Sequence, residues 1–246
     1  MNLPKKINPD NLIETIVEIR MIPMCPPELW AGMISVHLQE LGYKYIPAPQ
    51  LSVRLDKNGK MAVSVERGKE NTTYGIFIKE PIRFVMQGNS LSFNCNMGYY
   101  VGWDIYLKEI KAIVCAVQKC GIANDFNRVQ IRYISEYQNI DIIDYINGTI
   151  HIGSKIGSFR SQEIKLNRTD ENMKVFVSLV NKTKRKSANG EERISSLFDV
   201  NIYENFNLSN STELVTKMLD KIHKIEKETF FGLLKEDFIQ SLNPEY

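Results

Sequence analysis

Cysteine and histidine, the residues that bind most transition metals, are scarce in this sequence. Among 246 residues there are four cysteines and three histidines, and no Cys-x-x-Cys or His-x-x-x-His pair occurs. Cys115 and Cys120 lie five residues apart, so on a helix their side chains point in different directions. The sequence therefore predicts reduced, buried thiols, no metal site and no bound cofactor.

Long hydrophobic runs are also missing. No segment approaches the roughly 20 apolar residues that cross a bilayer, and the N-terminal stretch MNLPKKINPDN lacks the apolar core of a signal peptide. A strong charge of either sign is missing too, because 31 basic residues and 29 acidic residues leave a net charge of +2. These absences predict a cytoplasmic protein with no membrane partner and no general attraction to nucleic acid.

The remaining composition is that of a globular protein, with 43% hydrophobic and 24% charged residues. Its clearest element is the stretch from Gly98 to Gly121, in which apolar residues recur at alternating steps of three and four. They are Trp103, Tyr106, Ile110, Ile113, Val117 and Cys120. The pattern predicts a core helix bounded by the two glycines.

Before this helix the sequence predicts a strand, a helix and about four short strands. Leu12 to Met21 alternates apolar and polar residues, and a proline-led helix follows through Leu29 to Leu41. The Asn58-Gly59 pair predicts a hairpin turn between Leu51–Leu55 and Met61–Glu66. The other expected strands are Tyr74–Ile78, Ile82–Gln87 and Leu91–Cys95.

The second half of the chain resembles the first. Val17 to Met21 (VEIRM) matches Val129 to Tyr133 (VQIRY) at an offset of 112 residues. The same offset moves the core-helix pattern onto Val215 and Ile222, within a second helix expected from about Ser211. Between them the sequence predicts a short helix at Asp141–Ile146 and strands at Thr149–Ile152, Arg160–Leu166, Met173–Val180 and Ile194–Tyr203.

The sequence thus predicts an α+β fold of two similar β-α-β4-α halves, residues 1–122 and 123–246, in one continuous domain. The second half carries a helical C-terminal extension. This element order resembles the duplicated saddle of the TATA-box-binding protein. The resemblance implies a curved antiparallel sheet with helices on one face. Glu18, Arg20, Gln130 and Arg132 would then share the concave face, where we expect them to bind a ligand.

At the level of residues, the chain resembles a sporadically distributed family of prokaryotic proteins of similar length that has no assigned activity. The shared residues are Val17-Glu18-Ile19-Arg20, Gly102-Trp103, Ile131-Arg132-Tyr133-Ile134, and His223 followed by Phe230 and Phe231. The resemblance spans nearly the whole chain but brings no mechanism. The sporadic distribution suggests a defence or toxin-control setting.

No catalytic constellation emerges from the sequence. His37, His151 and His223 are far apart and sit on elements expected to be helix, strand and helix, and Gly-x-Ser-x-Gly is absent. Asp141 and Asp144 are one helical turn apart and match a cation site, but they also match a helix start. Gly153 to Ser158 is rich in small residues like a phosphate loop, yet lacks the Gly-Lys-Ser/Thr ending.

Two basic features are candidates for anion binding. Lys182, Lys184, Arg185 and Lys186 lie in the expected loop Asn181–Arg193 and match a phosphate-contacting surface, although lysine-rich hairpin tips also serve solubility. Arg20 and Arg132, at matching positions of the two halves, would form a two-armed anion clamp. The alternative for both arginines is an ion pair with neighbouring glutamates.

The C-terminal stretch has more apolar surface than a final surface helix requires. Phe231, Leu234 and Phe238 either pack on the core or contact a partner. The sequence favours a non-enzymatic binding or regulatory module with a protein partner. Alternatives are a sensor of a small anionic ligand or nucleotide, and salt-dependent nucleic-acid binding through residues 182–186. A homo-oligomer is a further alternative.

Overall fold

The computed structural model describes residues 3–47, 52–55, 61–64, 73–95, 99–148, 162–186 and 192–246. Its strands are β1 (Leu12–Pro23), β2 (Lys44–Ile46), β3 (Ser52–Leu55), β4 (Met61–Ser64), β5 (Thr73–Lys79), β6 (Ile82–Gln87), β7 (Ser90–Cys95), β8 (Ala123–Gln138), β9 (Gln162–Asp170), β10 (Met173–Lys186) and β11 (Glu192–Ser209). Its helices are α1 (Trp30–Glu40), α2 (Trp103–Lys119), α3 (Thr212–Leu233) and α4 (Glu236–Ser241). Short 3₁₀ turns cover Pro27–Leu29 and Ile142–Tyr145.

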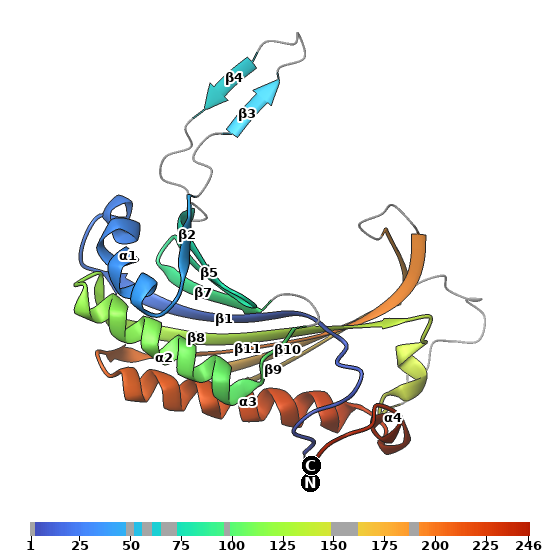
Figure 1. The fold of residues 1–246 in the computed structure, drawn as a ribbon. Helices are drawn as coiled ribbons and strands as arrows, with labels where there is room; N and C mark the ends of the chain where they lie inside the picture. The colour runs from blue at the N-terminus through green and yellow to red at the C-terminus, as the bar shows by residue number, and fades with distance from the viewer. Residues whose placement is uncertain are drawn as a thin grey trace. The chain divides into compact units, whose positions relative to one another are not determined.

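Nine of the described strands form one sheet, hydrogen-bonded in the order β2-β5-β6-β7-β1-β8-β11-β10-β9 (Figure 1). The pairs β2–β5, β5–β6, β6–β7, β9–β10 and β10–β11 are antiparallel. Strands β3 and β4 pair with each other in a separate two-stranded sheet. The predicted α+β class with an antiparallel sheet is therefore confirmed.

The chain divides into two compact units that do not coincide with its sequence halves. Unit 1 contains Met1–Thr15, Gln130–Glu204 and Met218–Tyr246. Unit 2 contains Ile16–Val129 and Asn205–Lys217. Strands β1, β8 and β11 and helix α3 each contribute residues to both units.

In unit 2, aromatic side chains form a ladder across three strands. Phe77, Phe84 and Phe93 are paired in register, with ring centroids 5.9 and 5.0 Å apart. All three are buried, as are the α2 residues Tyr106, Ile110, Ile113 and Val117. Gly102 and Gly121 flank α2 with φ of 85° and 65°, a conformation that glycine adopts without strain. The predicted core helix is confirmed from Trp103 to Lys119, while Gly98, its predicted N-terminal boundary, lies outside the described residues.

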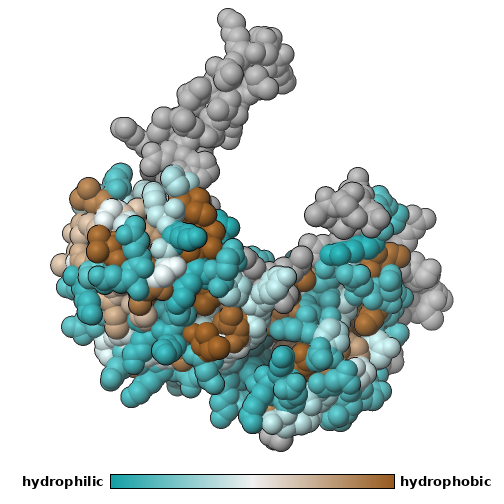
Figure 2. Space-filling view, in the orientation of Figure 1, coloured by the Kyte–Doolittle hydropathy of each residue, from teal (hydrophilic) through white to brown (hydrophobic). Residues whose placement is uncertain are grey.

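Helix α1 departs from its predicted packing. Trp30, Ile34 and Leu38 are buried as expected, but Leu29 and Met33 are exposed, together with Val36. Figure 2 shows apolar surface, drawn in brown, over this helix. The reason is that the apolar residues occupy a band wider than the face that α1 packs against β5 and α2.

In unit 1, α3 packs on one face of the sheet strands. The ring of His223 lies 5.8 Å from that of Tyr133 on β8, and Phe230 lies 4.9 Å from Phe198 on β11. Between α3 and β9–β10 there is a groove of about 350 Å³, lined by Leu166, Asn167, Arg168, Val175, Val177, Ile225, Glu228, Thr229, Gly232 and Leu233. Helix α3 therefore covers Val175 and Val177. The residues of β10 that alternate with these two valines project from the opposite face of the sheet.

Several predicted boundaries change. The expected loop Asn181–Arg193 is partly strand, because β10 continues to Lys186 and β11 begins at Glu192. Asp141–Ile146 forms only the 3₁₀ turn Ile142–Tyr145. The predicted strand at 149–152 and the turn at 56–59 lie outside the described residues. In the part of the chain that the structure describes, no helix is long and apolar enough to cross a membrane.

Candidate functional site

Strands β9, β10 and β11 present an ordered array of side chains on the face turned away from α3. Strand register places Thr169, Lys174 and Tyr203 in one row, Asn167, Phe176 and Asn201 in the next, and Lys165, Ser178 and Asp199 in a third. Residues opposite one another in antiparallel strands project from the same face. We call these nine residues the platform. Helix α3 of unit 1 lies on the opposite face of these strands (Figure 1).

The two aromatic residues of the platform are stacked on each other. The ring centroids of Phe176 and Tyr203 lie 5.9 Å apart, and the ring planes differ by only 21°. Phe176 is 39% exposed, although the strand residues on either side of it, Val175 and Val177, are 4% and 5% exposed. Phe176 is thus exposed while Tyr203 is half-buried, and a stacked pair with an exposed ring offers a surface to a planar ligand.

Polar side chains lie on both sides of the aromatic pair. Asn167 and Asn201 are the register partners of Phe176 on β9 and β11. The Oδ1 atom of Asn201 is buried and accepts no hydrogen bond from the described residues.

Two of the three charged side chains of the platform have an ion-pair partner, and the third has none in the described part of the chain. Lys165 pairs with Glu163 at 3.0 Å, and Asp199 pairs with Arg132 at 2.7 Å. The ammonium group of Lys174 instead lies 5.9 Å from the centroid of the Tyr203 ring, and no carboxylate of the described residues pairs with it. One cation of the platform is therefore available to an anionic group.

The residues predicted to bind an anion on the sheet are placed as follows. Arg132 donates from Nε and Nη2 to both oxygens of Asp199, and these hydrogen bonds raise the pKa of the guanidinium. Gln130 is half-buried two residues before it on β8. In unit 2, Glu18 accepts a hydrogen bond from Ser90, and Nε of Arg20 has no partner among the described residues. Since the four residues belong to two units, the two-armed clamp stays a prediction.

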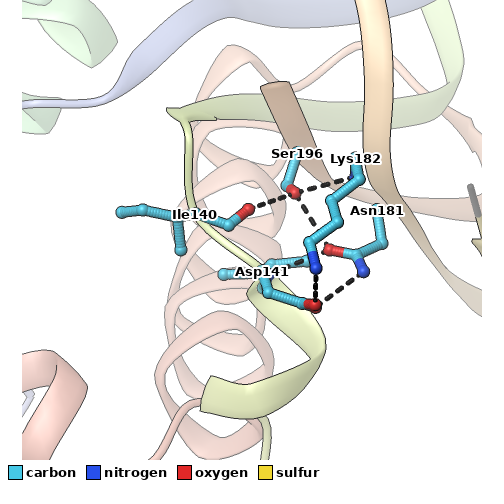
Figure 3. Close-up of polar contacts among 6 residues, drawn as sticks. Ile140, Asp141, Asn181, Lys182 and Ser196 are labelled. Carbon is cyan, nitrogen blue, oxygen red and sulfur yellow. Dashed lines mark hydrogen bonds and ion pairs between the residues drawn. The ribbon is translucent and has the colours of Figure 1, made fainter. Parts of the chain in front are cut away.

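The predicted basic cluster is partly neutralised. Lys182 forms an ion pair with Asp141, whose hydrogen bond raises the pKa of the lysine (Figure 3). Lys184 lies 3.6 Å from a carboxylate oxygen of Glu192. For Arg185 and Lys186 the structure describes the backbone register with Arg193 and Glu192 and not the side chains. Nucleic-acid binding by the cluster stays a prediction, with two of its four charges engaged internally.

A buried polar network explains the position of Lys182. The hydroxyl of Ser196 lies 2.6 Å from the carbonyl oxygen of Ile140 and 3.0 Å from Oδ1 of Asn181 (Figure 3). The same hydroxyl accepts a hydrogen bond from the backbone N–H of Lys182. Lys182 has a φ of 50° in an irregularity of β10 between Val180 and Thr183. The network thus stabilises a β-bulge that turns Lys182 towards Asp141.

Asp141 is part of this network, which weakens its case as a cation ligand. Its carboxylate accepts a hydrogen bond of 2.6 Å from Nδ2 of Asn181 and pairs with Lys182. Burial alone would raise the pKa of Asp141, but these hydrogen bonds outweigh it and lower the pKa. Among the residues that the structure describes, no group of three or more His, Cys, Asp or Glu side chains could hold a metal ion.

The C-terminal residues predicted as a partner interface pack within unit 1. Phe231, Leu234 and Phe238 are 6%, 1% and 4% exposed. Phe238 stacks on Tyr145 at 4.5 Å between ring centroids. The Nδ2 atom of Asn147 donates to the carbonyl oxygen of Leu234 at 2.7 Å. This is the arrangement of a segment folded back on its own unit, and an interface role for it stays a prediction.

The histidines are not brought together in the described part of the chain. His37 lies on α1, 3.8 Å from Glu40, and His223 is buried on α3 against Tyr133. His151 lies outside the described residues, as does the small-residue loop 153–158.

Sequence reasoning did not identify the platform. The signal was present in β10, where Phe176 stands at a position that alternation assigns to the polar side of the strand, between Val175 and Val177. Its partner Tyr203 could not be identified, because the pairing of β10 with β11 depends on a register that the bulge shifts. The sequence matches no family model and no curated protein.

Proposed function

We propose that this protein is a non-enzymatic binding or regulatory module that engages a macromolecular partner through the platform of unit 1. The observation that carries this proposal is the Phe176–Tyr203 stack, with Phe176 exposed, on the sheet face opposite to α3. Aromatic residues with an exposed face contribute much of the binding energy at protein surfaces, because they bury a large area with few rotatable bonds.

The proposal is tested by capture from the native cell. The tagged wild-type protein, the double variant Phe176→Ala/Tyr203→Ala and the control Leu208→Ala are compared. Leu208 is 61% exposed and belongs to unit 2, so the control removes apolar surface elsewhere. We expect wild type and control to retain the same partner, and the double variant to retain at least about tenfold less of it.

Folding of the variants is checked by thermal unfolding before the capture is interpreted. Equal recovery by wild type and the double variant would reject the platform as the binding surface. A wild-type protein that retains no protein or nucleic acid above background would reject the binding function itself.

The two other functions considered from the sequence receive less support. A small-anion sensor needs both arginines, and Arg132 is already engaged by both oxygens of Asp199. Nucleic-acid binding by the basic cluster needs free cations, and Lys182 and Lys184 have acidic partners. Binding at the platform does not require an ion pair to break, since Phe176 and Lys174 are exposed.

We further propose that the two halves of the chain arose by duplication and that the protein acts in the cytoplasm. The strand order supports the duplication, because each half places its first strand beside its last, β1 beside β7 and β8 beside β11. The two first strands are neighbours in the middle of the order. This arrangement supports the resemblance in topology to the duplicated saddle, which by itself carries no function.

A further inference from the structure

We propose that the partner of the platform is single-stranded nucleic acid, whose bases stack on Phe176 and Tyr203 while a phosphate contacts Lys174. This inference rests on the proposed function and names its partner. Every base has a flat aromatic surface, so an aromatic platform binds single strands with little sequence preference. A duplex keeps its bases stacked inside and does not offer them to such a surface.

The geometry of the aromatic pair fits this ligand. With ring planes that differ by 21°, Phe176 and Tyr203 are nearly parallel and stacked across two neighbouring strands, so a base that stacks on an outer ring face extends an existing stack. Both rings project from the strands on the face opposite to α3, and Phe176 is 39% exposed. An aliphatic partner side chain would use the same area, but it would gain nothing from the alignment of the rings.

The groups around the rings fit the polar parts of a nucleotide. Asn167 and Asn201 stand on either side of Phe176, and an amide carries both donors and an acceptor for base edges or sugar hydroxyls. The Lys174 ammonium lies beside the Tyr203 ring without a carboxylate partner among the described residues. A cation next to a stacking surface is the arrangement that contacts the backbone of a stacked base.

The charge at the platform is small, so it does not dominate the expected affinity. Glu163 is paired with Lys165 and Asp199 with Arg132, while Asp170 and Glu171 lie exposed just before Lys174 in the sequence. Lys174 supplies one cation, enough for about one phosphate contact. Affinity should come mainly from stacking, and its dependence on salt should be shallow.

The test uses the full chain and fluorescein-labelled oligonucleotides of about 12 residues, as RNA, as DNA and as a duplex of the same sequence. Binding is measured by fluorescence anisotropy. We expect the single strands to bind and the duplex to bind at least about tenfold more weakly. The RNA and DNA arms identify which single strand the platform prefers.

The variants separate stacking from simple apolar contact. Phe176→Ala and Phe176→Leu should both lower the affinity about 5- to 100-fold, because neither residue has a ring. Phe176→Tyr should retain the affinity. Leu166→Ala is the matched control, since Leu166 is 45% exposed on the α3 side of β9 and lines the groove there. It should bind as wild type does.

Salt dependence distinguishes the platform from the basic cluster. One phosphate contact on a single strand gives a slope of about −0.7 in log affinity against log salt, and Lys174→Ala should abolish it. Lys182→Ala/Lys184→Ala should leave affinity unchanged. A steep slope that disappears in the second variant instead would overturn the platform as the binding site.

A measurement on the wild-type protein tests the inference even where a variant fails to fold. Ultraviolet cross-linking of the bound oligonucleotide should label peptides that contain residues 174–178 or 201–203. Absence of single-strand binding up to about 100 µM, or full binding by Phe176→Ala, would overturn the inference. If capture from cells still depends on Phe176 while no oligonucleotide binds, the proposed function stands and its partner is a protein.

Discussion

At the scale of single residues, α3 carries two buried ionisable side chains whose pKa values are shifted in opposite directions. Burial raises the pKa of Glu226 to about 8, although Lys227 opposes the shift. Burial also lowers the pKa of His223 to about 3, and Lys227 adds to that effect. Both side chains are thus neutral near neutral pH, as groups removed from water prefer to be.

These shifts predict a stability optimum below neutral pH. Between about pH 4.5 and 8 the folded protein holds one proton more at Glu226 than the unfolded chain, so stability falls as pH rises. Between about pH 3 and 6.5 the unfolded chain holds one proton more at His223, so stability rises with pH. The two slopes cancel from pH 4.5 to 6.5. Stability should then fall by about 2 kcal/mol between pH 6.5 and 8.

Chemical denaturation of Glu226→Gln across this range tests the prediction. Glutamine resembles the protonated acid but does not titrate, so the fall above pH 6.5 should disappear. Glu228→Gln, an exposed change on the same helix, should keep it. A fall of equal size in all three proteins would show that Glu226 is not its cause.

At the scale of elements, α1 contacts β5 at a glycine. A Cβ atom on Gly75 would lie 3.1 Å from Cε2 of Phe77 and 3.3 Å from Cβ of Ala31, closer than ordinary packing allows. Gly32 stands within α1, and a Cβ atom there would meet nothing within 4 Å. Gly75 therefore lies at the helix–strand contact, whereas Gly32 lies on the exposed side of α1.

We expect Gly75→Ala and Gly32→Ala to change stability in opposite directions. Gly75→Ala should destabilise the protein by about 1–3 kcal/mol, because Phe77 is buried and has to move. Gly32→Ala should stabilise it by about 0.5–1 kcal/mol, because alanine favours a helix interior. Both variants replace glycine with alanine, so they lower the conformational entropy of the unfolded chain equally. A difference between their urea midpoints therefore reflects a difference in the stability of the folded states. Destabilisation by both would contradict the described packing of α1.

The elements that the sequence predicted well have local signals. Strand β6 was predicted at its observed bounds, and α2 is fixed by its periodicity and by Gly102 and Gly121. The errors have non-local causes. The basic residues after Val180 resemble a loop, yet pairing with β11 holds them in strand beyond a bulge that Asn181 and Ser196 stabilise. The platform could not be predicted for the same reason, since it depends on the register of three strands.

At the scale of the whole molecule, the two units take residues from both sequence halves. In unit 2, Ala123, Phe126, Val129 and Val215 are fully buried although they belong to the second half. Gln118 of α2 also donates a hydrogen bond of 2.8 Å to the carbonyl oxygen of Asn210. A fragment that ends at residue 122 lacks all of these partners.

We therefore expect fragment 1–122 not to fold cooperatively by itself. Removing four buried apolar side chains leaves the core of unit 2 open, and each such loss costs about 2–5 kcal/mol in folded proteins. The measurement is thermal unfolding followed by circular dichroism, with the full chain as reference. Co-expression of fragments 1–122 and 123–246 should restore a cooperative transition, because every described contact is then present. A sharp transition of 1–122 alone would instead support the halves as separate folding units.

The N-terminal and C-terminal segments of unit 1 lie side by side (Figure 1). Lys6 and Glu245 form an antiparallel bridge, and Asn8 donates its N–H to the carbonyl oxygen of Leu242. Each segment therefore satisfies the backbone of the other. Neither end can fray alone without breaking the hydrogen bonds that hold its neighbour. These hydrogen bonds join the two terminal segments to each other. We therefore expect both segments to unfold locally as one unit.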